Sequence, residues 1–220
     1  GVTLSWTAPD SDGGSALMEY RLEQSADSGQ TWTTVVKPLA TSTSVSITNL
    51  SPGSSYRFRL LAVNGPGLSP YSNVVIVATP AVIPGTPKGL VLSQITTSGF
   101  LAAWSAPDSD GGSAITDYKL ELSDDGSTWK TVSKSASAST SFTFNSLLPG
   151  KKYYVRVSAV NLVGSSPATS SVFATTLATT PSAPKNLASS AITSTGVTLS
   201  WTAPDSDGGS ALMEYRLEQS

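Results

Sequence analysis

Apolar and polar residues alternate along much of this chain. In residues 2–6 and again in residues 56–60, every second side chain is apolar. A period of two indicates a half-buried β-strand, because successive side chains of a strand point to opposite faces of the sheet. Turn residues separate these segments, as at residues 9–14 and 51–53. Short strands at regular spacing, with no sustained helical period, predict an all-β protein built from antiparallel sandwiches.

The chain contains a long repeat with a shorter one inside it. Residues 1–25 recur without change at residues 196–220, which defines a repeat of 195 residues. Trp6, Trp104 and Trp201 follow one another at intervals of 98 and 97 residues, in closely similar surroundings. The long repeat therefore consists of two related modules, each large enough to bury its own core. Such perfect identity exceeds what folding requires, so we expect a tandem array that arose by recent duplication.

A set of ordered motifs carries a resemblance to a known family. In the first module, residues 4–9, 20–23, 50–56 and 62–64 read LSWTAP, YRLE, LSPGSSY and AVN. Together with the Pro-x-x-Pro-x-x-Leu pattern at residues 84–90, this order resembles the fibronectin type III module. The resemblance implies tandem seven-strand antiparallel β-sandwiches of the immunoglobulin-like type, arranged like beads on a string. We also expect a repetitive bacterial protein that is extracellular or attached to the cell surface.

Three modules follow from the repeat and the resemblance. We place a module that lacks its first strand at residues 1–80 and a complete module at residues 84–177. Residues 181–220 are expected to hold the first strands of a third module, up to the strand that contains Tyr215 and Leu217. The closely spaced prolines between modules favour extended, semi-rigid linkers.

Composition argues against several classes of function. The chain has no cysteine and no histidine, so it lacks disulfides and the usual general base of serine or cysteine nucleophiles. A net charge of −2 with 13% charged residues does not suit a nucleic-acid surface or a polybasic membrane patch, and no apolar run is long enough for a transmembrane helix. We predict no catalytic residue, no cofactor, no nucleic-acid partner and no membrane insertion. Abundant Ser and Thr favour an extracellular location.

Carboxylates are paired in the Asp-Ser-Asp-Gly-Gly turns, at Asp10 and Asp12 and at Asp108 and Asp110. Their oxygens suit calcium, but a full calcium site needs about six to eight ligands and each turn supplies two carboxylates. Acid–base catalysis would require contrasting surroundings for the two groups, and the turns offer no apolar pocket. We favour turns stabilised by their own Asp side chains and predict no metal, with calcium at these turns as the less favoured alternative.

Five aromatic residues are assigned to the fold. Trp6, Trp104 and Trp201 lie on apolar strand faces and match the family's core tryptophan, so we expect them to pack inside the sandwich. Tyr56 and Tyr153 stand where such sandwiches carry a corner tyrosine, whose hydroxyl bonds to the nearby backbone. All five are predicted to be structural.

Two further tryptophans, Trp32 and Trp129, follow short polar turns. We expect them to cover the edge of a sheet. A contact surface for a sugar or a neighbouring module is the alternative, because an aromatic ring near an edge suits both roles.

These features favour a non-catalytic structural repeat of an extracellular fibre, filament or cell-surface stalk. Its expected partners are other copies of the same module or chain, which would permit self-assembly, and surface glycans or proteins. Two alternatives stay open: an adhesin stalk or ligand-binding array, and spacer modules of a secreted polysaccharide-degrading enzyme.

Overall fold

The structure is a computed structural model that describes residues 1–219. Within this range the chain forms strands and connecting loops, with no helix that could cross a membrane. The strands are short, and turns rich in Gly, Pro and Asp separate them, as the alternation of apolar residues indicated. The predicted all-β class is confirmed.

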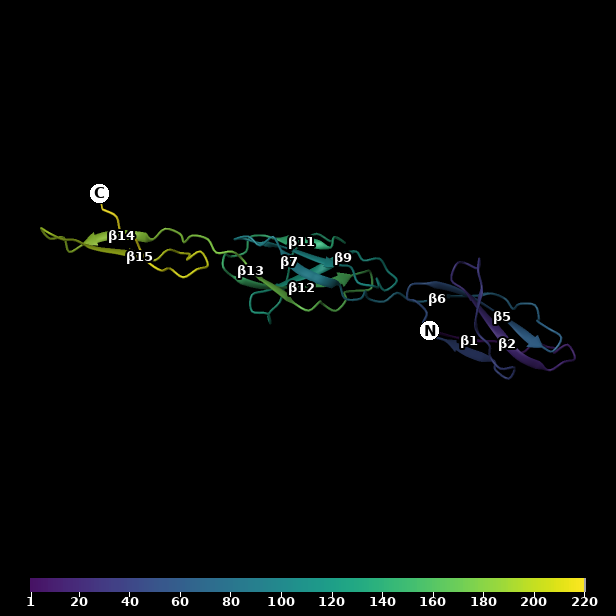
Figure 1. Ribbon diagram of the computed structural model, residues 1–220. Coiled ribbons are helices and arrows are strands. Elements are labelled where there is room, and N and C mark those ends of the chain that lie inside the picture. Colours follow the sequence, from purple (N-terminus) through teal and green to yellow (C-terminus); the bar gives the residue numbers. More distant parts are fainter. Residues whose placement is uncertain (220) are drawn as a thin grey trace. The chain divides into compact units, whose positions relative to one another are not determined.

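The middle module is a sandwich of two antiparallel sheets (Figure 1). Its strands are β7 (Lys88–Ser93), β8 (Phe100–Ser105), β9 (Asp117–Ser123), β10 (Lys130–Thr131), β11 (Ser141–Phe144), β12 (Lys152–Val160) and β13 (Val172–Thr175). One sheet has the order β10-β9-β12-β13 and the other has the order β11-β8-β7. This is the seven-strand sandwich that the resemblance implied.

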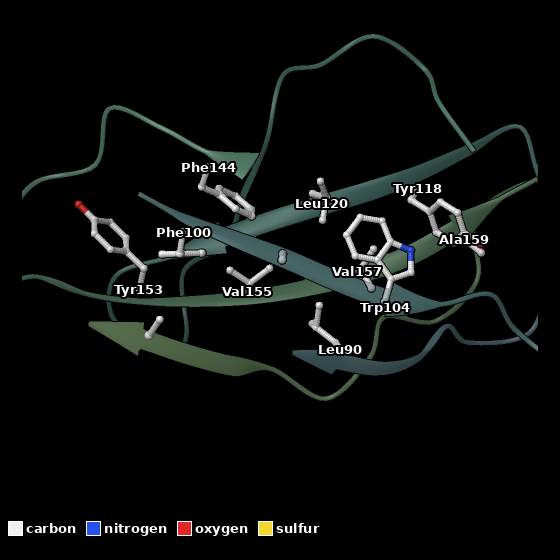
Figure 2. Packing of buried hydrophobic residues seen from close by; sticks show 12 residues of the cluster. Leu90, Phe100, Trp104, Tyr118, Leu120, Phe144, Tyr153, Val155, Val157 and Ala159 are labelled. Carbon is white, nitrogen blue, oxygen red and sulfur yellow. The ribbon is translucent and has the colours of Figure 1, made fainter. Parts of the chain in front are cut away.

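The core of the middle module lies between these sheets. Along β12, Tyr153, Val155 and Val157 are buried, and the residues between them are less so, because alternate side chains point inward. Figure 2 shows them facing Phe100 from β8 and Leu120 from β9. Full burial of an aliphatic side chain of this size contributes about 1.5–3 kcal/mol. Because the strands pack on this core, it positions the loops that connect them at both ends of the module.

The first module repeats this plan with six strands. They are β1 (Val2–Ser5), β2 (Leu17–Ser25), β3 (Thr33–Val36), β4 (Ser44–Ile47), β5 (Ser55–Asn64) and β6 (Val75–Ala78). Their sheets have the orders β3-β2-β5-β6 and β1-β4. The core centres on Leu22, Tyr56 and Phe58. In residues 1–84, no strand takes the position that β7 has in the middle module.

The third module departs from the prediction. Its strands β14 (Lys185–Ser190) and β15 (Thr198–Thr202) pair with each other. The strand expected to contain Tyr215 and Leu217 is absent from residues 203–219, so this part of the prediction was wrong. The same sequence forms β2 in the first module, where β3 and β5 supply hydrogen-bond partners on both sides. No strand follows β15 in the described residues, and an extended segment without a partner has no ladder to join.

The chain divides into two compact units. One consists of Gly1–Pro84 with two loops, Ser109–Ala114 and Asn161–Gly164. The other contains the remainder of the middle module together with the third. Each of the contacts described below lies within one unit.

Candidate contact site at the glycine-rich turns

The Asp-Ser-Asp-Gly-Gly turns have one geometry in all three modules. In the middle module, the Gly111 amide donates to Ser109 Oγ at 3.1 Å, and the Gly112 amide donates to Asp110 Oδ1 at 2.8 Å. The two glycines have φ of +74° and +77°, a region that residues with a Cβ rarely adopt. The Asp and Ser side chains therefore cap the turn, and the glycines permit its backbone path.

The same two bonds recur in the other copies. In the first module, the Gly13 amide donates to Ser11 Oγ at 3.1 Å and the Gly14 amide donates to Asp12 Oδ1 at 2.8 Å. In the third, the Gly208 amide donates to Ser206 Oγ at 3.1 Å and the Gly209 amide donates to Asp207 Oδ1 at 2.8 Å. Gly14 and Gly209 share a φ of +81°. The turn is therefore an element whose geometry the repeat reproduces.

Three of the four carboxylates considered for calcium have partners within the protein. Asp12 and Asp110 accept from the backbone of their own turns, as described above. Asp108 forms an ion pair with Lys88. Asp10 lies exposed at the start of the first turn. Among residues 1–219, no three acidic side chains gather in a group that could hold a metal ion.

Each described linker binds to the turn of the module that follows it. The Val82 amide donates to the Gly111 carbonyl at 2.9 Å, and the Val82 carbonyl accepts from Asn161 Nδ2 at 2.8 Å. Asn161 Nδ2 also donates to the Asp110 carbonyl at 2.8 Å, which ties the turn to the end of β12. In the next linker, the Thr179 amide donates to the Gly208 carbonyl at 2.8 Å. We call the two glycines of a turn the linker acceptor. Where an Asn lies at the end of the neighbouring strand or directly after it, as Asn64 and Asn161 do, it is part of the acceptor.

A second contact places two glycine-containing turns against each other. A Cβ built on Gly112 would lie 2.3 Å from the Pro52 carbonyl oxygen, and one on Gly53 would lie 2.1 Å from the Gly112 carbonyl oxygen. Gly150 and Gly209 repeat this approach, because a Cβ built on Gly150 would also lie 2.1 Å from the Gly209 carbonyl oxygen. A carbon never fits at such distances, so glycine is required on both sides. The Pro-Gly turn of one module and the Gly-Gly turn of the next pack backbone to backbone.

Sequence reasoning considered these turns for calcium and missed their contact role. The signal was present in the spacing: Pro-Gly, Gly-Gly and Asn recur together in both modules at matching positions. Both glycines suit the positive φ of the turn, and the structure adds a second reason for Gly112, the close approach of another backbone.

Each core tryptophan pairs edge to face with the tyrosine that lies 14 residues further along the chain. Trp104 and Tyr118 have ring centroids 5.3 Å apart at 67°, and Trp6 stands at 5.3 Å from Tyr20. Trp201 lies 5.4 Å from Tyr215. Trp104 is buried, whereas Trp6 and Trp201 are half-buried. Such pairs are worth about 0.5–1.5 kcal/mol beyond the area they bury.

The corner tyrosines hold the loop before their strands. The Ser51 amide donates to Tyr56 Oη at 2.9 Å, and the Leu148 amide donates to Tyr153 Oη at 3.1 Å. The hydrogen bonds from Ser51 hold the pKa of Tyr56 below its usual value, because they stabilise the phenolate. Both residues shape the loop that carries the Pro-Gly turn.

Trp32 and Trp129 lie half-buried over arginine side chains. The Arg59 guanidinium is 4.1 Å from the centroid of Trp32, and that of Arg156 is 4.2 Å from Trp129. Arg156 Nε also donates to Glu121 Oε2 at 2.7 Å, and this bond holds the pKa of Glu121 below its usual value despite burial. The rings cover ion pairs on the sheet face, a structural use of cation–π contact.

The comparison with protein families decides the identity of the modules. The model of the "Fibronectin type III domain" matches residues 1–78 and 85–175. The chain belongs to the fibronectin type III family. The module limits expected from the sequence, at 80, 84, 177 and 181, remain predictions. A structure of the chicken CNTN1 FN1–FN3 domains shares the fold, with a TM-score of 0.56 and 18% identity over 90% of this chain and 69% of that one.

Three curated proteins with similar sequences come from animals. Titin of Drosophila melanogaster is 31% identical over 99% of this chain, and fibronectin type-III domain-containing protein 3A of Mus musculus is 30% identical over 99%. Slow-type myosin-binding protein C of Rattus norvegicus is 26% identical over 74%. The chain spans 1%, 18% and 29% of their lengths. Titin and myosin-binding protein C are among these relatives, and they support a structural repeat. The relatives give no support to the bacterial source expected above.

Proposed function

We propose that this fibronectin type III array is a structural segment of an extracellular or cell-surface fibre or stalk, in which each module is joined to the next by a bound linker. The observation that carries the proposal is the recurrence of one junction. Val82 on Gly111 and Thr179 on Gly208 form the same hydrogen bond at 2.9 Å and 2.8 Å, although the linker side chains differ. A contact made by backbone atoms tolerates sequence change and so suits a repeated connection.

The surface supports the extracellular part of the proposal. Only 13% of residues are charged, and hydroxyl side chains are abundant along the loops. The chain also has no cysteine and so needs no particular redox environment. Partners in this setting are other copies of the module, with surface glycans or proteins as further candidates.

Location and assembly can be tested together on the cells that make the protein. Antibody raised against the 195-residue repeat should label intact cells, and electron microscopy should find labelled filaments or stalks at their surface. Label confined to permeabilised cells would contradict the proposal. Isolated thin strands that end in another domain would instead favour an adhesin stalk or an enzyme spacer.

A second candidate rests on the relative whose name states a binding partner. Myosin-binding protein C is 26% identical over 74% of the chain. In this alternative the array binds a protein filament such as myosin. Co-sedimentation of the purified chain with myosin filaments tests it, and a chain that stays in the supernatant excludes it.

A further inference from the structure

The linker acceptor of the first module has no occupant within the described chain. A Cβ built on Gly14 would meet no atom within 4 Å, whereas one built on Gly112 or Gly209 would lie 2.3 Å from a proline carbonyl oxygen. A Cβ on Gly13 would meet only Asn64 Nδ2, at 3.6 Å. In the third module, the equivalent Gly208 lies against Thr179, with its Cβ position 2.1 Å from the Thr179 carbonyl oxygen. The same turn is therefore open in one copy and covered in another.

The open acceptor lines a cavity. Its volume is about 360 Å³, and it lies wholly within the first compact unit. Gly13, Leu17, Asn64 and Leu68 contribute to its walls. Leu68 is 58% exposed, so this wall is apolar as well as open.

The polar groups needed for a linker are already in position. Asn64 Nδ2 donates to the Asp12 carbonyl at 2.8 Å, as Asn161 does to Asp110. Asn161 uses its second N–H for the Val82 carbonyl, and within residues 1–219 the second N–H of Asn64 has no acceptor. The Gly13 carbonyl likewise accepts no hydrogen bond from the described residues. Asn64 Nδ2 can therefore donate one hydrogen bond and the Gly13 carbonyl can accept one, as the equivalent groups do with Val82 in the middle module.

We propose that this acceptor binds the linker and Pro-Gly turn of a further copy of the 195-residue repeat. The occupant is a second copy of residues 177–182, with the Pro149–Gly150 turn packed on Gly14. Sequence identity selects this occupant. Residues 10–14 are identical to residues 205–209, and that turn already binds Thr179 and, through the Ser206 carbonyl, the amide of Ser182 at 3.0 Å.

The test fuses one repeat, residues 1–195, ahead of the full chain, so that the acceptor at residues 10–14 of the second repeat has a linker before it. Amide hydrogen exchange is then followed by mass spectrometry on peptides that contain residues 177–182. These peptides have one sequence in both repeats, so a single mass envelope reports both linkers. We expect one protected population, because both linkers donate to a glycine carbonyl. Two populations, with about half exchanging as a free linker, would overturn the proposal.

One substitution placed in either repeat supplies the matched control. Gly14→Ala in the second repeat puts a Cβ where the Pro-Gly turn packs, and should transfer about half of the linker population to fast exchange. Gly14→Ala in the first repeat introduces the same strain at a φ of +81° but meets an open acceptor, so exchange of the linkers should not change. Equal effects of the two variants would contradict the proposal. The readout does not depend on whether the protein is extracellular, so it can fail or succeed independently of the proposed function.

Discussion

At the scale of single residues, the contribution of the Tyr153 hydroxyl to stability can be measured directly. It accepts from the Leu148 amide at 3.1 Å, in a side chain that is 7% exposed. Tyr153→Phe leaves that amide without its partner while keeping the ring in place. We expect a loss of about 1–2 kcal/mol in the free energy of unfolding, measured by urea denaturation of the chain.

The neighbouring tyrosine supplies the control. Tyr154 is half-buried, packs its ring 5.7 Å from Phe173, and within the described residues its hydroxyl makes no hydrogen bond. Tyr154→Phe should therefore change the free energy of unfolding by less than about 0.5 kcal/mol. If both variants lose the same stability, the hydrogen bond to Leu148 is not what Tyr153 contributes.

A second residue-scale prediction concerns acid. The hydrogen bond from Arg156 holds the pKa of Glu121 below its ordinary value of 4.5, so the folded state favours the carboxylate. The resulting stability is present above that ordinary value and is lost as the pH falls through the folded-state pKa. Glu121→Gln should lose less stability between pH 7 and pH 3 than the parent chain, in urea denaturation at both values. Glu214→Gln, on an exposed residue, serves as the control and should follow the parent.

At the scale of elements, one segment shows that a strand depends on its partners. Residues 17–24 lie in β2 (Leu17–Ser25), but the same amino acids at residues 212–219 form no strand. The alternation of apolar residues is equal in both copies. The difference lies in β3 and β5, which follow β2 in the first module and have no counterpart among the described residues after β15. Alternation therefore predicted where strands can form, whereas pairing decided which of them do.

Supplying the missing partners should restore the strand. We expect that a chain extended after residue 220 by a copy of residues 26–84 forms a ladder at residues 212–219, because a β5-like segment becomes available. The measurement is amide exchange of Tyr215 and Leu217, which should slow to the rates of Tyr20 and Leu22. Unchanged exchange would mean that the partners alone are not sufficient.

At the scale of the whole molecule, the fold could be predicted from the sequence and the contact site could not. The period of two, the tryptophan spacing and the ordered motifs are local signals, so they indicate the sandwich directly. The contact site includes the close approach of Gly53 to Gly112, two positions that are far apart in the chain. Neither glycine indicates in the sequence which residue it will contact, because each is also required by the turn in which it lies. Only coordinates reveal that the second glycine serves another backbone.

The same turns also decide whether the molecule needs a metal, and this gives a final prediction. Asp110 Oδ1 accepts from the Gly112 amide at 2.8 Å, a bond that an Asn side chain oxygen can also accept. Asp110→Asn should keep the melting temperature, whereas Asp110→Ala should lose about 1 kcal/mol of stability with the cap. Melting in a chelator should leave the parent unchanged, since one capped turn offers too few oxygens for calcium. Two results together would assign the turns to calcium. The melting temperature of the parent would fall in chelator and recover when calcium is added, and Asp110→Asn would show the same fall without chelator. Equal melting of the parent and Asp110→Asn would assign them to the backbone contacts that join one module to the next.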